Sequence, residues 1–201
     1  MSVDVVTGPL LTFVIFNPQK PRHELFCDLF LVVSIQLCAL GYGVWSVWEA
    51  RPLFLVAEID RFKVIGRPAL AEDALSRLRN IKPPSFFQGP ITVAIRKPDN
   101  EEERKKILFE SLLGGRDYGE RPEFYLPYEG NNALKSLDRA KPISIFLNRY
   151  PDAAVAIDVL AEKTKNHKDA LKYLPIVART SWVAILDVDG MIIGFVPGDG
   201  F

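Results

Sequence analysis

The residues most able to do chemistry are polar side chains placed inside apolar stretches. Asp4 and Asp28 lie in two apolar segments near the start of the chain, and Gln36 lies in the second. A carboxylate costs about 3 kcal/mol at mid-bilayer and usually marks a functional site, and polar groups in lipid seek partners. We therefore name all three as candidate contacts with a partner protein within a membrane. Since Asp28 lies one turn into its segment, a simple interfacial position near the positive end of the helix dipole is the alternative.

A second group of candidate residues is a set of tyrosines in the stretch over residues 116–132, which also contains Phe124. Surface loops often carry binding residues. We therefore name Tyr118, Tyr125 and Tyr128 as candidate partner-binding residues. The alternative is an ordered loop that is packed by its own aromatic rings, and the sequence leaves both interpretations open.

The sequence does not indicate a known type of catalytic or metal centre. It has no G-x-S-x-G, P-loop, H-E-x-x-H or G-x-G-x-x-G pattern. His167 lies among lysines, whereas a metal site needs several convergent ligands. Residues 187–190 resemble part of a calcium loop, but the pattern is incomplete and a tight turn is expected. Cys27 and Cys38 both fall in the apolar region. We predict that the protein is not an enzyme and has no metal site and no cofactor.

The charge balance does not indicate a nucleic-acid partner. The 201 residues include 25 Lys and Arg and 25 Asp and Glu, so the formal net charge is zero. Nucleic-acid binding usually requires a basic excess. Most of the long apolar stretches fall within the first fifty residues. The length allows one sizeable domain in addition to this apolar region.

Asp28 and Gln36 lie in an apolar segment over residues 25–48, which would position them in the membrane. It has roughly the 20 or more residues that a spanning helix needs. Tyr42, Trp45 and Trp48 cluster at its end, where aromatic rings favour the headgroup layer. A cleavable signal peptide is the competing interpretation, but its apolar core should be about 7–15 residues long. No proline interrupts the segment, so we predict one continuous transmembrane helix.

The apolar stretch over residues 3–16 is shorter than a spanning helix and contains Gly8 and Pro9, which would kink a helix. We interpret it as a partial helix, the second half of a spanning helix whose first half is missing. This interpretation predicts a truncated N-terminus or an internal start at Met1. A re-entrant or interfacial segment is the alternative.

The loop over residues 17–24 predicts the membrane topology. Lys20 and Arg22 lie close to both apolar segments, and the positive-inside rule places such a loop in the cytoplasm. The chain is thus divided into a membrane region over residues 1–50 and an extracytoplasmic domain over residues 51–201.

The domain over residues 51–201 has the patterns of an α+β fold. Alternation over residues 53–65 predicts a strand with a bulge or break near Asp60. Asn100 is a good N-cap for a helix that ends at Gly114. Further elements are expected in this order: a short helix over 68–80, a strand over 91–95, helices around 133–149, 151–164 and 167–173, the last stopped by Pro175, and a C-terminal β-hairpin with strands over 181–187 and 191–196.

Three segments carry a family resemblance. They are an Asp-x-x-x-Gly-Pro-Leu-Leu-Thr pattern over residues 4–12, an Asp-Leu…Gln-Leu…Tyr-Gly pattern over residues 28–43, and an Ala-Arg-Pro…Asp-Arg-Phe pattern over residues 50–62. With these segments the chain resembles the type IV pilin accessory proteins of bacteria (the TfpX/TfpZ family). The resemblance covers nearly the whole chain, and the first hundred residues carry most of its specificity.

The resemblance implies a bacterial inner-membrane protein with a periplasmic domain that supports pilin stability or pilus assembly. It implies a type IV pilin subunit as partner, together with the lipid bilayer, and no catalytic residues and no nucleic acid. Family members carry a full upstream helix and a further membrane-proximal loop. Two rival functions are a membrane-tethered sensor ectodomain, which would need an attached output module, and a membrane-anchored hydrolase, which the missing nucleophile and metal motifs disfavour.

Overall fold

The computed structural model describes residues 21–71, 73–79, 81–85 and 87–201. The predicted partial helix over residues 3–16 lies outside the described residues, as does most of the loop over residues 17–24. The chain divides into two units, with the boundary after Ala50, and each is considered by itself.

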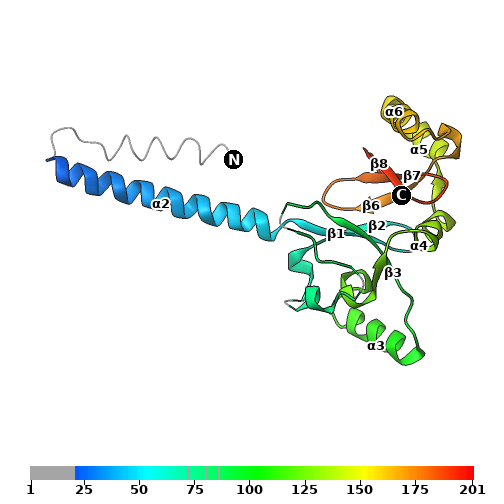
Figure 1. Cartoon of the computed structure of the whole chain (residues 1–201), viewed down its shortest axis with the longest axis horizontal. Helices are drawn as coiled ribbons and strands as arrows, with labels where there is room; N and C mark the ends of the chain where they lie inside the picture. Colours follow the sequence, from blue (N-terminus) through cyan, green and yellow to red (C-terminus); the bar gives the residue numbers. More distant parts are fainter. Residues whose placement is uncertain (1–20, 72, 80, 86) are drawn as a thin grey trace. The chain divides into compact units, whose positions relative to one another are not determined.

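The described part of the first unit is one helix, α2 (Arg22–Glu49) (Figure 1). It runs without a break through Gly41 and Gly43, so the predicted continuous helix is confirmed. Each glycine costs only about 1 kcal/mol in helix propensity, and no proline removes a backbone hydrogen bond. Over His23–Glu49 the helix is long and apolar enough to cross a membrane.

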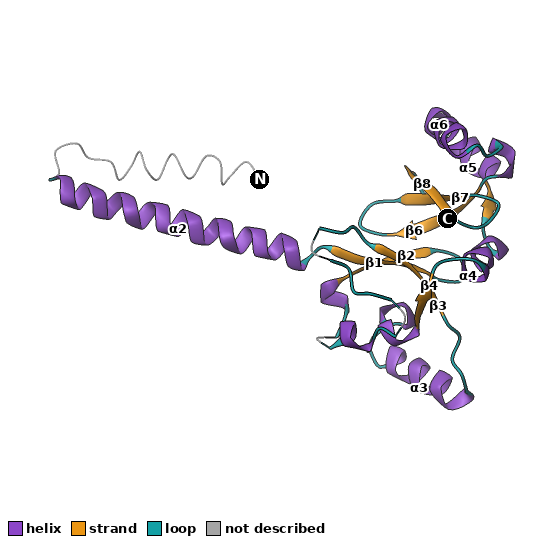
Figure 2. Cartoon of the chain, in the orientation of Figure 1, coloured by secondary structure: helices purple, strands orange, loops and turns teal. Residues whose placement is uncertain are grey.

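The second unit is built on a mixed sheet of eight described strands (Figure 2). Most neighbours are antiparallel, but β1 pairs with β3, and β2 with β6, in parallel. The strand order is β4-β3-β1-β2-β6-β7-β8, and β5 pairs with β6 beside this path. The strands are β1 (Pro52–Ala57), β2 (Phe62–Gly66), β3 (Ile91–Ile95), β4 (Tyr125–Pro127), β5 (Lys141–Pro142), β6 (Lys172–Val177), β7 (Trp182–Leu186) and β8 (Ile192–Pro197).

Short helices cover this sheet, which confirms the predicted α+β class. Figure 2 shows α5 and α6 beside β7 and β8, and α3 on the side of β3 and β4. The α-helices are α3 (Glu101–Leu112), α4 (Asn131–Leu134), α5 (Ile143–Arg149) and α6 (Ala154–Thr164). The 3-10 turns are η1 (Arg67–Ala69), η2 (Ala74–Arg77), η3 (Tyr118–Glu120), η4 (Pro122–Phe124), η5 (Lys135–Asp138), η6 (Pro151–Ala153) and η7 (Lys168–Ala170).

The N-cap of α3 and the C-terminal hairpin are confirmed. The Asn100 side chain accepts a hydrogen bond from the Glu103 backbone N–H at 2.7 Å. In the hairpin, β7 and β8 pair antiparallel across a turn in which Gly190 has a φ of 78°, a left-handed conformation that favours glycine. The Asp187 carboxylate accepts hydrogen bonds from the backbone N–H groups of Asp189 and Met191. The Asp187 side chain therefore shapes the predicted tight turn.

Several local predictions were wrong or incomplete. The helical stretch expected around 133–149 is divided into α4, η5 and α5, with strand β5 before α5, and the one expected over 167–173 is the short turn η7 followed by β6. The chain near Asp60 makes a full reversal, so the single expected strand becomes the antiparallel pair β1 and β2. In place of the helix expected over residues 68–80, the described residues form two short 3-10 turns, η1 and η2. Pro175 does not stop a helix but lies inside β6. On one side of β6, β5 pairs as far as Tyr173 and β2 pairs from Ile176 onward. Pro175 lies between these two partners, where no backbone N–H is needed for pairing on that side, so a proline is tolerated.

The core of the second unit consists of three apolar clusters. The first cluster joins β1, β2, β6 and β7 to α4 and includes Phe62 and Tyr128. The second lies where α5 and α6 cover β6, β7 and β8, around Phe146 and Ile157. The third lies between β1, β3 and the turns η1 and η2, around Phe54. These clusters occupy both faces of the sheet, so the sheet is the centre of the unit.

Candidate interaction surfaces

In α2 the predicted polar residues share one face of the helix. Asp28, Val32 and Gln36 follow one another at intervals of four residues, which places their side chains above one another. Val32 is buried, and Asp28 and Gln36 are half-buried, whereas most of the helix surface is exposed. Both polar side chains take part in interactions. Asp4, the third predicted membrane residue, lies outside the described residues.

Two of the three predicted tyrosines are buried in the second unit, Arg51–Phe201, which we call the soluble unit. The Tyr125 hydroxyl donates to the Gly119 carbonyl oxygen at 2.6 Å, and its ring packs edge-on against Phe54. The Tyr128 hydroxyl donates to the carbonyl oxygen of Gly190 in the β7–β8 turn, also at 2.6 Å. Burial raises the pKa of both phenols. Both side chains therefore pack the loop, which is the alternative role considered for them.

Tyr118 lies nearer the surface than the other two. Its hydroxyl donates to the backbone carbonyl oxygen of Arg96, and its ring contacts Phe124 at a centroid distance of 4.9 Å. Burial raises the pKa of the Tyr118 phenol to about 12. The half-buried Tyr118 ring thus connects the loop to the end of β3, and the structure does not gather the three tyrosines into one surface.

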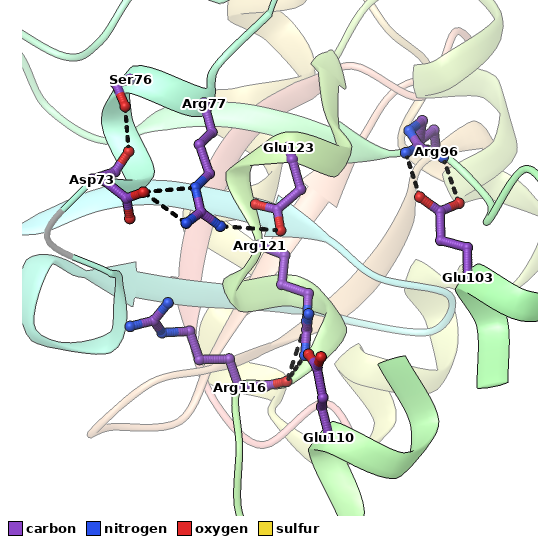
Figure 3. Close-up of polar contacts among 9 residues, drawn as sticks. All are labelled: Asp73, Ser76, Arg77, Arg96, Glu103, Glu110, Arg116, Arg121 and Glu123. Carbon is purple, nitrogen blue, oxygen red and sulfur yellow. Dashed lines mark hydrogen bonds and ion pairs between the residues drawn. The ribbon is translucent and has the colours of Figure 1, made fainter. Parts of the chain in front are cut away.

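Ion pairs hold α3 to the end of β3 and to the loop over residues 116–132 (Figure 3). The Arg96 guanidinium donates to both carboxylate oxygens of Glu103, at 2.9 and 3.1 Å. Arg121 pairs with Glu110 of α3 at 2.7 Å and also donates to the backbone carbonyl oxygen of Arg116. The hydrogen bonds from the two guanidinium groups lower the pKa of both carboxyl groups. Since such paired contacts are directional, they fix the position of α3 on the unit.

A charged hollow of about 510 Å³ lies between η2, the end of α3 and the loop that follows it. Arg77 lines it and pairs with Asp73 at 2.6 Å and with Glu123 at 4.0 Å. Figure 3 shows the Arg116 side chain directed away from Glu110. No residue that the structure describes forms an ion pair or hydrogen bond with the Arg116 guanidinium. A guanidinium in this position can bind an acidic or polar group.

The exposed face of α3 beside this hollow is apolar. Four large side chains on its C-terminal half and at its C-cap are more than half exposed, and we call them the α3 ridge: Leu108, Phe109, Leu112 and Leu113. They form two pairs at a spacing of four residues, so they lie together on the helix surface. Contiguous exposed apolar groups with a polar surround are typical of interaction sites.

Sequence reasoning missed both the α3 ridge and Arg116. The run Ile107-Leu108-Phe109 shows that α3 is apolar on more than one face. Only Ile107 is buried. The sequence therefore held a signal of excess apolar surface, but it did not show which residues remain exposed.

Comparisons with known proteins support an assembly role. The chain is 32% identical over 207 residues to the fimbrial assembly protein of serogroup I of Dichelobacter nodosus, covering 100% of this chain and 78% of that protein. It is 32% identical over 208 residues to the serogroup E1 protein, with the same coverage. It is 40% identical over 74 residues to the protein of serogroups C1 and C2, covering 37% of this chain and 56% of that protein. No protein-family model matches the chain, and no solved structure matches it significantly.

Proposed function

Because the chain belongs to the family of fimbrial assembly proteins, we propose that it supports the assembly of a type IV pilus by binding the pilin subunit. The observation that carries this proposal is the similarity to two fimbrial assembly proteins over the whole chain. The apolar helix α2 and the interaction surfaces of the soluble unit provide two places where a pilin could be held. The chain acts in this proposal by binding and performs no chemistry.

The membrane contact is assigned to the polar face of α2. A pilin that waits in the membrane as a single helix presents few groups that distinguish it from lipid. Polar side chains provide such specificity, because in hydrocarbon they favour a hydrogen-bonding partner. Asp28 and Gln36 lie on one face of α2 and would contact the pilin helix. Asp4 is proposed to contribute from the preceding segment.

The contact with the pilin head is assigned to the α3 ridge and the charged hollow. The α3 ridge offers apolar side chains, and Arg116 offers a guanidinium for an acidic group of the head. Tyr118 lies beside this region and supports it through Arg96. Tyr125 and Tyr128 are proposed to act indirectly, because their rings and hydroxyls hold the loop in place.

This function requires the soluble unit and the pilin head to be on the same side of the membrane. We therefore propose an inner-membrane location with residues 51–201 in the periplasm. Single cysteines at Arg22 and Lys165, in a background without Cys27 and Cys38, test this topology. A membrane-impermeant thiol reagent should label position 165, which is exposed, in cells whose outer membrane has been permeabilised. Protection at 165 with labelling at 22 in the same cells would reverse the orientation.

The assembly role is tested by deleting the gene and counting surface pili and cellular pilin. We expect pili to be lost on deletion and to return with the wild-type gene. The double variant Phe109→Ser/Leu112→Ser should restore few pili although its protein level stays normal. The double variant Val155→Ser/Val159→Ser is the matched control, because it changes two exposed apolar residues on α6. Normal pili and normal pilin turnover in the deletion strain would refute the role.

The membrane contact is tested separately with Asp28→Asn. If Asp28 contacts the pilin helix, pilus number should fall while the protein level is unchanged. A photo-crosslinking residue at position 36 should then capture pilin, and one at Leu31, an exposed apolar position of α2, should capture it less efficiently. Full assembly with Asp28→Asn would leave Asp28 as an interfacial residue only.

A further inference from the structure

The register of the sheet brings three chain segments to one edge of the soluble unit. Pro52, at the start of β1, pairs with Gly66, at the end of β2. Phe54 of β1 pairs with Ile91, the first residue of β3. The residue before β1, the turn after β2 and the loop before β3 therefore meet at the same edge. We call this the anchor-side edge, because α2 ends at Glu49 and only Ala50 separates it from Arg51.

A loop with one very exposed aromatic side chain is attached to this edge. Arg51 donates a hydrogen bond from Nη1 to the backbone carbonyl oxygen of Ser85 at 3.2 Å. Two residues later, Phe87 is 94% exposed, more than any other large apolar side chain in the described part of the chain. Prolines at 83, 84 and 90 restrict the loop and reduce the entropy lost when it is held in one conformation.

Two basic side chains lie in or near this loop, at the anchor-side edge. Lys82 precedes Phe87 in the loop and is exposed, and no ion pair joins its ammonium group to any residue that is described. Arg67 follows Gly66 at the same edge and is also exposed. An exposed aromatic ring and two exposed cations at one edge fit a bilayer surface, where the ring enters the interface and the cations meet lipid phosphates.

Chain connectivity selects the bilayer over other occupants. Two residues of chain span at most about 7 Å, so Arg51 cannot move far from the end of α2. Tyr42 and Trp45 pack at a centroid distance of 6.0 Å near that end of the helix, where aromatic rings favour the headgroup layer. The hydrogen bond from Arg51 then keeps the loop near the same layer, in whichever direction the rest of the soluble unit extends.

We propose that the anchor-side edge is a membrane-contact surface: Phe87 enters the headgroup layer, and Lys82 and Arg67 bind the phosphates of anionic phospholipids. This second attachment restricts the rotation of the soluble unit about the residues that connect it to α2. The proposal rests on α2 crossing the bilayer and does not depend on the pilin role.

The test uses the full chain without Cys27 and Cys38, in nanodiscs of anionic phospholipid, with a spin label at Gly89→Cys. A Cβ at Gly89 would meet no atom within 4 Å, so the label is accommodated. The matched control is Ile59→Cys, because Ile59 is 79% exposed in the turn at the opposite end of β1. The quantity measured is the accessibility ratio, which is the accessibility of a label to oxygen divided by its accessibility to a water-soluble nickel complex. We expect this ratio to be roughly threefold higher at position 89 than at position 59.

A second variant separates insertion from mere proximity. Phe87→Ser, with the label kept at 89, should return the accessibility ratio to that of position 59, and Lys82→Glu should lower the ratio in anionic but not in zwitterionic nanodiscs. The proposal is overturned if the labels at 89 and 59 are equally accessible to the nickel complex in anionic nanodiscs. It is equally overturned if the label at 89 becomes shielded only after purified pilin is added.

Discussion

Helix α2 and the sheet of the soluble unit use the same residue types in opposite ways. In α2, Phe30 is 74% exposed, whereas in the soluble unit Phe54 and Phe62 are completely buried. A helix that is apolar over most of its surface needs an apolar solvent or partner around that surface. Successive side chains of a β-strand point to opposite faces of the sheet. Because the apolar clusters cover both faces, few large apolar side chains of the strands stay exposed. The difference teaches that apolar content alone does not locate a core, because the environment of each element decides where its apolar side chains point.

The largest expected effect concerns a phenylalanine in each region. Phe62→Ala should destabilise the soluble unit by about 3–5 kcal/mol, because it leaves a cavity in the first core cluster. Phe30→Ala should leave the thermal midpoint of the soluble unit unchanged. Thermal unfolding of both full-length variants in detergent, followed by near-ultraviolet circular dichroism, measures the difference. Equal losses would show that α2 is part of the same folding unit.

A charge distinguishes the two regions with a somewhat smaller effect. Leu37→Arg, near the middle of α2, should reduce membrane insertion by an apparent free energy of about 2.5–3.5 kcal/mol. Val159→Arg, on the exposed face of α6, should change the stability by less than about 0.5 kcal/mol. Glycosylation-site mapping measures insertion of α2, and thermal unfolding measures the α6 variant. Unimpaired insertion of Leu37→Arg would argue against a spanning helix.

The phenol of Tyr128 provides a third contrast, because it makes a buried hydrogen bond across the fold. Tyr128→Phe should cost about 1–2 kcal/mol, since the Gly190 carbonyl oxygen loses its donor inside the unit. Tyr42→Phe in α2 should cost nothing measurable, because Tyr42 is exposed. Chemical denaturation of the soluble unit in the full chain reports both. If Tyr128→Phe left the stability unchanged, a water molecule would be donating to the Gly190 carbonyl oxygen instead.

The smallest expected effect is a pH-dependent contrast within the soluble unit. Pairing with Arg96 lowers the pKa of Glu103, so its stabilisation is present above the unfolded value of 4.5 and lost as the pH falls through the folded pKa. Burial raises the pKa of Glu58, so its contribution is largest below 4.5 and lost as the pH rises through the folded pKa.

Two variants measure these opposite signs. At pH 7, Glu103→Gln should lower the thermal midpoint slightly, and Glu58→Gln should raise it. The Glu58→Gln difference should shrink as the pH falls to 4.5 and below, where Glu58 is protonated in both states. The Glu103→Gln difference should shrink only as the pH falls through the lowered folded pKa of Glu103. If Glu58→Gln lowered the midpoint at pH 7, the nearby Lys63 would outweigh the cost of burial.

Local sequence patterns were sufficient to predict the elements that are specified by residues close together in the chain. The length and apolarity of α2 follow from an unbroken run of side chains, and the start of α3 follows from Asn100 and the acidic residues after it. The β7–β8 hairpin follows from alternating apolar residues around a turn that needs Gly190. Each of these is set by interactions over a few residues, so a single sequence is sufficient.

Tertiary structure decided the features that depend on distant partners. From the sequence, Pro175 predicts the end of a helix. It fits inside β6 only because the neighbouring strand on one side changes there from β5 to β2. The tyrosine loop was open to two interpretations until the hydroxyl of Tyr128 was placed on Gly190, 62 residues away. The exposure of Phe109 and Leu112 depended in the same way on how α3 is fixed by Arg96 and Arg121. Burial and pairing are properties of the assembled sheet, and no local pattern specifies which surface remains uncovered.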